Sequence, residues 1–312
     1  MIFIWMHLFF ILVDVFRTFG IISLVSIYLL ILAGGIVRST GSGMGCPDWP
    51  KCFGRMIPPT QASELPFNYQ EIYKEKLHGQ VLFNPTKTWI EYLNRLLGVL
   101  TGVFVVITTF LAFKESKKIF WYTLAALILV ILNAILGKYV VDSFLLPGVV
   151  TAHMLLSIGV IYFLIKALNI HSISEVYILE NRQWIMINLC IVFLQILLGT
   201  QVRENVDHVI LELGESAKSE WIGQLGIMFI SHRTFSWFLM LSHFILWNKL
   251  KDSTLQRYRH GMMALIGISF LTGILMAYFA FPLGSQAIHL FISLVLIGLH
   301  MNNYIRTKSI HV

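Results

Sequence analysis

Among the histidines inside apolar stretches long enough to be membrane helices, His153, His232 and His289 each lie about one to two turns from the start of their stretch. Ionisable groups within a bilayer are costly and usually functional. Two imidazoles that face each other across a helix bundle can hold one haem iron from both sides. We therefore predict that His232 and His289 are paired haem-iron ligands. The alternatives are hydrogen-bonded core histidines or zinc, and zinc is disfavoured because no further His, Cys or carboxylate converges there.

An internal repeat places these histidines at equivalent positions. The segment ILAGGIVR (31–38) matches ILLGTQVR (196–203), which begins 165 residues later. Asn94-Arg95 matches His232-Arg233, and HMLLS (153–157) matches HLFIS (289–293). Each half therefore has two candidate ligand positions, one on each of two helices. Three of these four positions are histidines, and the fourth is Asn94.

Glu91 breaks the symmetry of the two halves. It precedes Asn94 by three residues, so both lie on one helix face. Its repeat equivalent is Phe229, so the carboxylate is present in the first half only. This predicts chemistry in the first half, with Glu91 as a catalytic residue, and electron transfer in the second. The alternatives are an interfacial anchor or an ion pair with Arg95.

Two further groups of residues belong to the predicted sites. The first group consists of arginines, which can bind the propionate groups of a haem. Snorkelling of the side chain to the membrane interface explains each arginine equally well. The pair Cys46 and Cys52 flanks Pro-Asp-Trp-Pro in a polar loop, where it can be a staple or a redox pair, whereas Cys190 is expected to be inert packing. The arginines predicted at outer helix ends are Arg38, Arg95, Arg203 and Arg233.

The elements that position these residues are membrane helices. The 312 residues are 57% apolar and 12% charged, with a mean hydropathy of +0.75. This composition excludes an ordinary soluble domain and a disordered chain. The net charge of +7 comes from short connections between apolar spans, so nucleic acid is not an expected partner. Eight stretches can span a bilayer: 19–37, 89–113, 119–138, 149–168, 184–202, 224–247, 260–281 and 283–304.

The repeat and the charges predict the architecture. Lys and Arg crowd the connections on one side, whereas 139–148 and 282–284 have none, which predicts that both termini are cytoplasmic. Four helices per repeat give a parallel repeat about an axis along the membrane normal. The fold class is an all-α membrane protein of eight transmembrane helices in two pseudo-symmetric four-helix bundles. The predicted domains are 1–168, with a long outer loop at 38–88, and 169–312, with an outer loop at 203–222.

The N-terminal segment is apolar but lacks a basic region and a small-residue cleavage site, so no cleaved signal peptide is predicted. It is expected to extend the first helix or to lie in the interface.

The segment GGIVRSTGSGMGCPDWPKC (34–52) resembles the first helix and first loop of the haem A synthase family. The motif Glu91-x-x-Asn94-Arg95 and the histidines at 153, 232 and 289 follow in the order of that family, so the resemblance covers essentially the whole chain. It implies two similar four-helix halves in the bacterial inner membrane, with the haem sites toward the outer side.

The resemblance also implies an activity. The C-terminal half would hold haem b through His232 and His289, and the N-terminal half would bind haem o. The C8 methyl of haem o would be oxidised through an alcohol to the formyl group of haem a, for terminal oxidase assembly. The acid at Glu91 would be important for this oxidation, and Cys46 and Cys52 can form a disulfide. Haem o synthase and the oxidase assembly machinery are the implied partners; a homo-oligomer is left open, and the electron partner is unknown.

Asn94 departs from the family pattern, in which most members have histidine. Because an amide is a poor ligand of haem iron, the first-half iron would be held by His153 alone, or by a further ligand such as His78. This departure keeps two alternatives to the enzyme open: a b-type membrane cytochrome and an inactive haem-binding paralogue. A transporter is disfavoured, because it would have polar groups near the midplane.

His243 and His300 follow the second-half pair by 11 residues each, which is about three helical turns. A second haem site near the cytoplasmic side is one interpretation. We expect instead that they are interfacial residues near helix ends. The first half has Val105 and Leu164 at the equivalent positions.

Overall fold

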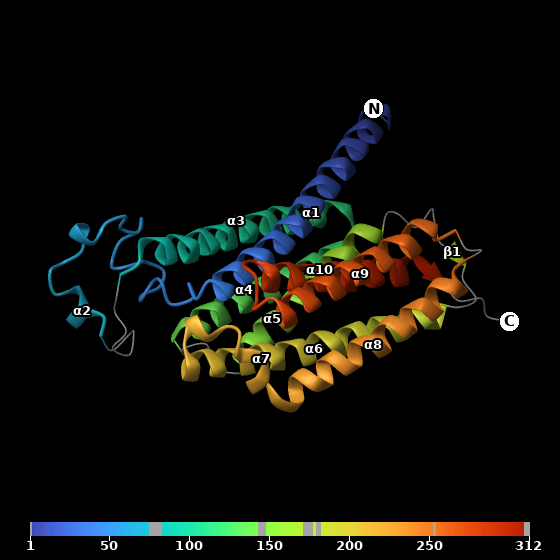
Figure 1. The fold of residues 1–312 in the computed structure, drawn as a ribbon. Coiled ribbons are helices and arrows are strands. Elements are labelled where there is room, and N and C mark those ends of the chain that lie inside the picture. Colours follow the sequence, from blue (N-terminus) through green and yellow to red (C-terminus); the bar gives the residue numbers. More distant parts are fainter. Residues whose placement is uncertain are drawn as a thin grey trace. The chain divides into compact units, whose positions relative to one another are not determined.

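The computed structural model describes residues 2–74, 83–142, 148–170, 177–178, 182–251 and 254–308, with side chains from residue 15 onward except at residues 142, 177, 178 and 215. His78 lies outside these residues. Long helices cover each of the eight predicted stretches (Figure 1). They are α1 (Ile2–Ser39), α3 (Pro85–Glu115), α4 (Lys117–Asp142), α5 (Val149–Asn169), α6 (Arg182–Leu213), α8 (Gly226–Lys249), α9 (Gln256–Tyr278) and α10 (Ser285–Arg306). Short elements connect them: η1 (Ala62–Glu64), α2 (Tyr69–Ile72), β1 (Tyr177–Ile178), η3 (Glu215–Ala217), α7 (Trp221–Gln224) and β2 (Thr307–Lys308).

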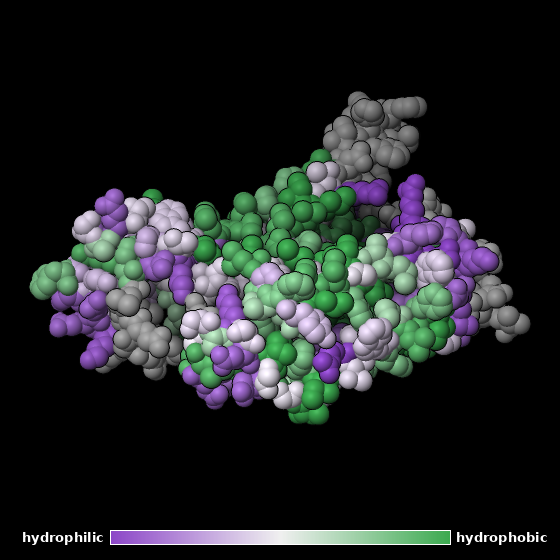
Figure 2. Space-filling view, viewed as in Figure 1, coloured by the Kyte–Doolittle hydropathy of each residue, from purple (hydrophilic) through white to green (hydrophobic). Residues whose placement is uncertain are grey.

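Seven of the helices in the described part are long and apolar enough to cross a membrane. Large apolar side chains such as Phe113 and Ile135 are exposed on them, which suits a lipid environment, and Figure 2 shows hydrophobic residues along the long helices. The protein is therefore a multi-pass membrane protein. Helix α8 is not among the seven because it contains His232, Arg233 and His243, which lower its hydropathy. Eight spans with both termini cytoplasmic remain a prediction.

Local signals explain where the helices begin and end. Pro85 begins α3 after the cap residue Asn84, whose Oδ1 accepts the backbone N–H of Lys87 at 3.0 Å. Ser116 ends α3, and its hydroxyl accepts the N–H of Ile119 in the first turn of α4. Because the caps end one helix and begin the next within a few residues, the connection between two apolar helices can be short, as between α3 and α4.

The last two helices are separated where the sequence predicted a turn. The backbone between α9 and α10 turns through positive φ at Ala280, Phe281 and Gly284. Pro282 within this segment has no N–H to continue a helix. The split of one long apolar block into two helices is therefore confirmed.

Two helices are longer than predicted. The backbone of α1 is helical from Ile2, so the N-terminal segment extends the first helix. Helix α6 continues to Leu213, although 203–222 was predicted to be an outer loop. The prediction was wrong because this polar segment keeps a helical stripe of apolar residues. Val206 and Val209 in this stripe pack against Trp221 in a buried cluster.

The chain divides into two compact units, residues 1–164 and 165–312. In the first, α1 packs against α3 and α3 against α4. Helix α5 joins α4 through Asn133, whose Nδ2 donates to Ser157 Oγ at 2.8 Å. In the second, α6 packs against α8 and α10, and α9 packs against α10. The predicted division of roles between two bundles stays a prediction.

Three residues of the second unit differ from expectation. His243 and His300 were expected at the interface, but both side chains are fully buried. They lie on the faces of α8 and α10 that pack inside the unit, and depth along a helix does not reveal which face is buried. Cys190, expected to be inert packing, is exposed on α6.

Candidate functional site

The second unit brings His232 of α8 and His289 of α10 together. Their ring centroids are 6.3 Å apart, with an angle of 66° between the ring planes. The buried pair His243 and His300 has the same interplanar angle but a centroid distance of 5.0 Å, and its two Nε2 atoms are in direct hydrogen-bond contact. The His232–His289 pair is therefore wider than a directly bonded imidazole pair.

The ring of His289 is oriented by α9. Its Nδ1 lies 3.0 Å from the carbonyl oxygen of Ser269 and 2.9 Å from Thr272 Oγ1. Because a carbonyl oxygen only accepts, Nδ1 carries the proton and Nε2 keeps a free lone pair. A histidine whose Nδ1–H is held by a carbonyl is the usual arrangement of a metal-ligating imidazole.

His232 is approached by Gln195 from α6. The Gln195 amide nitrogen donates to the carbonyl oxygen of His232 at 3.1 Å and lies 3.4 Å from its Nε2. His232 Nδ1 and Gln195 Oε1 are buried and have no hydrogen-bond partner among the described residues. Sequence reasoning missed Gln195, although the repeat aligns it with Leu30 and so marks a polar residue found in only one half.

Glycines make room for both rings. A Cβ added at Gly199 of α6 would lie 3.2 Å from His232 Cε1, and one at Gly273 of α9 would lie 3.7 Å from His289 Cε1. The contact at Gly199 is tighter than normal packing, so a side chain there would displace the ring. The sequence contained this signal, because Gly199 lies within the repeated segment.

The first unit repeats this construction around Asn94 and His153. Gly34 of α1 faces Asn94 Oδ1, and Gly137 of α4 faces His153 Cε1, at 4.0 and 3.5 Å from an added Cβ. These glycines are the repeat equivalents of Gly199 and Gly273. His153 Nδ1 and Asn94 Oδ1 are buried and have no hydrogen-bond partner in the part of the chain that the structure describes.

One serine hydroxyl is also repeated. Ser157 Oγ donates to the carbonyl oxygen of His153 at 3.1 Å, and Ser293 Oγ donates to that of His289 at 2.9 Å. The two units therefore have the same local framework. The main chemical difference within it is that the first unit has Asn94 where the second unit has His232.

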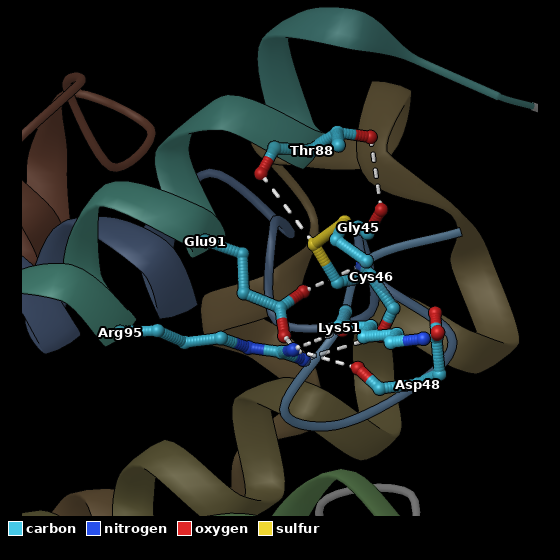
Figure 3. A network of polar contacts seen from close by, with 8 residues as sticks. Gly45, Cys46, Asp48, Lys51, Thr88, Glu91 and Arg95 are labelled. Carbon is cyan, nitrogen blue, oxygen red and sulfur yellow. Dashed lines mark hydrogen bonds and ion pairs between the residues drawn. A yellow bond between two sulfur atoms is a disulfide. The ribbon is translucent and has the colours of Figure 1, made fainter. Parts of the chain in front are cut away.

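Glu91 lies where α3 meets the first loop, as Figure 3 shows. Its side chain is 3% exposed. One carboxylate oxygen accepts the backbone N–H of Cys46 at 2.9 Å, and the other accepts from Arg95 at 2.5 Å. The ion pair considered from the sequence is therefore present, and the loop contact was not foreseen.

Arg95 holds the loop rather than facing open space. Its guanidinium donates to the carbonyl oxygens of Asp48, Lys51 and Cys46 at 2.6, 3.1 and 3.3 Å (Figure 3). A guanidinium group has five N–H donors, so it can make several such contacts at once. These contacts were not predicted, because backbone carbonyls of a distant loop leave no trace in the sequence.

The loop itself is a folded unit. Cys46 and Cys52 form a disulfide and are fully buried. Phe53 and Leu65 form a small core with aromatic residues from α2 and α3. Gly45 packs so closely against α3 that an added Cβ would lie 2.6 Å from the carbonyl oxygen of Lys87. The loop is therefore fixed to the helix that contains Glu91.

Two loop groups have shifted pKa values. Hydrogen bonds from the Thr60 side chain and backbone lower the pKa of Glu64 to about 2, so this carboxylate stays ionised beside Arg55. Burial, and then the charge of Asp48, raise the pKa of Tyr73. Tyr73 packs edge-on against Phe53 at 5.3 Å between ring centroids. Both groups stabilise the loop in its ordinary protonation states.

The other arginines have varied surroundings. Arg203 is paired with Asp207 at 2.7 Å, within the part of α6 that was predicted to be a loop. Arg233 is exposed, with its guanidinium 5.5 Å from the centre of the Phe229 ring. Arg38 is half-buried in the last turn of α1. Their predicted contacts with haem propionates stay predictions.

Comparison with known proteins places this arrangement in a family. The model of the cytochrome oxidase assembly protein family matches residues 17–301, which is most of the chain. The chain belongs to this family. The resemblance to haem A synthases seen in the sequence is thereby confirmed.

Several relatives carry the name haem A synthase. The protein of Flavobacterium psychrophilum is 25% identical over 87% of this chain and 92% of its own length. That of Shewanella oneidensis is 34% identical, but the match covers 43% of this chain and 39% of the relative. That of Orientia tsutsugamushi (strain Ikeda) is 30% identical over 58% of this chain and 60% of its own length.

The family match contains every predicted site residue from Arg38 to His289. It also contains residues that the sequence analysis did not single out, such as Gln195 and Ser269. The structure places these beside the second-unit histidines, where they orient the rings.

Proposed function

We propose that this family member is a haem A synthase, an oxidoreductase that converts haem o to haem a. The observation that carries the proposal is the facing pair His232 and His289 within a chain that matches the family from residue 17 to 301. Haem b is the proposed cofactor of the second unit, and haem o is the substrate of the first.

The second-unit residues fit haem b. His289 has Nδ1 held by Ser269 and a free Nε2, and the buried Nδ1 of His232 has no hydrogen-bond partner among the described residues, whereas Gln195 lies 3.4 Å from its Nε2. The 6.3 Å between ring centroids exceeds the 5.0 Å of the directly bonded pair, so the rings leave space for an ion between them. When bound, haem b supplies one-electron transfer. Arg203 and Arg233 are the proposed partners of its propionates.

The first-unit residues fit a haem held from one side. His153 supplies the imidazole, and Asn94 offers only an amide at the position equivalent to His232. We propose Arg38 as a propionate partner. Arg95 instead acts through the loop, because its guanidinium already contacts three loop carbonyls.

Glu91 is the proposed catalytic residue of the oxidation of the C8 methyl to a formyl group. Its carboxylate is buried at the junction of α3 and the disulfide loop, where it can relay protons or stabilise positive charge on the substrate. The disulfide keeps the loop folded over this group. Phe229 at the equivalent position of the second unit can do neither.

The proposed setting follows from the same resemblance. The chain lies in the bacterial inner membrane with both termini cytoplasmic and the haem sites toward the outer side. Haem o synthase would supply the substrate, and the product would serve terminal oxidase assembly.

Pigment analysis tests the proposal. The protein is purified after co-expression with a haem o synthase, and its haems are separated and identified by mass. Haem b together with haem o, its alcohol or haem a supports the enzyme. Haem b alone favours one of the alternatives, a b-type membrane cytochrome or an inactive haem-binding paralogue. Asn94 is the specific argument for the inactive paralogue. Absence of any haem contradicts the proposed ligands.

Asn94 gives a separate prediction about iron coordination. With haem o bound, the first-unit iron is expected to be high-spin in the wild-type protein, because His153 is its only strong ligand. Asn94→His should convert it to a low-spin bis-histidine haem, since imidazole binds iron far better than an amide. Absorption and electron paramagnetic resonance spectra measure the change.

Asn94→Gln keeps the amide and serves as the matched control, which should remain high-spin. A wild-type spectrum with two low-spin haems would show that another ligand completes the first site.

A further inference from the structure

A second polar cluster lies buried in the second unit, away from the proposed haem site. His243 of α8 and His300 of α10 are both 0% exposed, and their Nε2 atoms are 3.0 Å apart. Tyr258 of α9 is also buried, and its hydroxyl lies 2.7 Å from His300 Nδ1. The cluster is a continuous hydrogen-bonded chain of three titratable side chains.

The direction of each hydrogen bond follows from one carbonyl. His243 Nδ1 lies 2.8 Å from the Leu239 carbonyl oxygen, which only accepts, so Nδ1 carries the proton of His243. His243 Nε2 therefore accepts from His300 Nε2–H, and His300 Nδ1 accepts from the Tyr258 hydroxyl. Every ring nitrogen is satisfied in the neutral state. One added proton on His300 Nδ1 requires one change, in which the Tyr258 hydroxyl turns from donor to acceptor.

The fold does not require this cluster. The repeat equivalents of His243 and His300 in the first unit are Val105 and Leu164, and both are also 0% exposed. The same positions are thus filled by apolar residues in a unit of the same design. Since buried ionisable groups in a membrane are costly, their presence in one unit only indicates a function of that unit.

The surroundings of the cluster contribute little charge. From α6, Asn188 accepts the Ser242 hydroxyl at 3.0 Å, and both groups are neutral. From α9, Arg259 is the neighbouring cation; its guanidinium stacks on Trp247 at 3.8 Å and donates to the Trp247 carbonyl oxygen. Helices α8 and α10 each contribute one histidine, and these two are the titratable groups of the two helices that the described contacts place in the cluster.

The position of the cluster connects it to haem b. His243 and His300 lie on the two helices that contain His232 and His289, 11 residues further along each, or about 16 Å. Tyr258 is buried but lies in the first turn of α9, so it is the member nearest to a helix end. A proton that enters at this end of α9 does not pass the proposed haem site.

We infer that His243, His300 and Tyr258 form a proton-binding site that loads one proton when haem b gains one electron. The inference rests on the proposed function, because it requires haem b between His232 and His289. The electron comes from a one-electron donor, and the proton comes from the aqueous side at which α9 begins. The proton resides on His300 Nδ1, so the second unit keeps its net charge. Oxidation of haem b reverses both transfers.

The midpoint potential of haem b, measured against pH by spectroscopic redox titration of the holoprotein, tests this inference. Wild-type protein should show a potential that falls by up to about 59 mV per pH unit, as one proton per electron requires. His243→Val with His300→Leu, the residues of the first unit, should abolish this slope while haem b stays bound. Ser236→Ala removes a hydroxyl of α8 outside the cluster and should keep the wild-type slope.

Tyr258→Phe provides a second variant that keeps both imidazoles and the ring packing. In this variant, the pH range over which the midpoint potential changes should shift. Phenylalanine lacks the hydroxyl whose hydrogen bond with His300 Nδ1 must reverse when the proton is added. A potential independent of pH in wild type, or an unchanged slope in the double variant, overturns the inference and leaves the proposed function intact. A protein without haem b overturns both.

Discussion

Replacing His232 or His289 with alanine is expected to remove haem b from the purified protein. Each imidazole is one of the two proposed ligands of the haem iron; Ser269 of α9 orients the His289 ring, and Gln195 of α6 donates to the backbone carbonyl oxygen of His232. Loss of groups that merely orient a metal ligand costs about 10–100-fold in affinity, so loss of the ligand itself should cost more than about 100-fold. Haem b per chain is measured after extraction as its pyridine complex.

The matched control is His208→Ala, which removes an exposed histidine of α6 in the same unit. It should keep the full haem b content. Retention of haem b in both the His232→Ala and His289→Ala variants would contradict the proposed site. Added imidazole should restore part of the absorption spectrum if only the ligand, and not the fold, has been lost.

Glu91→Gln is expected to lower the formation of haem a from haem o by about 100-fold or more, the usual effect of losing an acid–base residue. Glutamine can still accept the N–H of Cys46, so the loop should stay attached to α3, whereas the charge that faces Arg95 is lost. Haem b should remain, because its proposed ligands belong to the second unit. Products are separated and identified by mass after a timed incubation.

A loop effect must be distinguished from a chemical effect at Glu91. Gly45→Ala pushes the loop away from α3 but keeps the Glu91 carboxylate, since the added Cβ meets the Lys87 backbone. Limited proteolysis of the loop should therefore be faster in Gly45→Ala and unchanged in Glu91→Gln. If Glu91→Gln loses activity only together with faster cleavage of the loop, Glu91 is a loop anchor and not a catalytic residue.

The amino-acid sequence determined the elements and the depth of the candidate groups along them. Apolar runs with short polar breaks predicted the helices, because a bilayer requires a minimum apolar length. The position of His232 and His289 along their stretches predicted a similar depth, and the structure brings the two rings together. The Cys46–Cys52 pair was identified because its spacing permits a disulfide, which is present.

Only the tertiary structure decided what each side chain meets. The contacts of Glu91 and Arg95 with the first loop depend on a fold of residues 45–52 that has no helical period to analyse. His243 and His300 were expected at the interface but are buried inside the unit, because spacing along a helix gives height and not the partner that covers a face. The extension of α6 to Leu213 was missed because hydropathy detects the end of a membrane span, whereas the helix continues on the packing of Val206 and Val209.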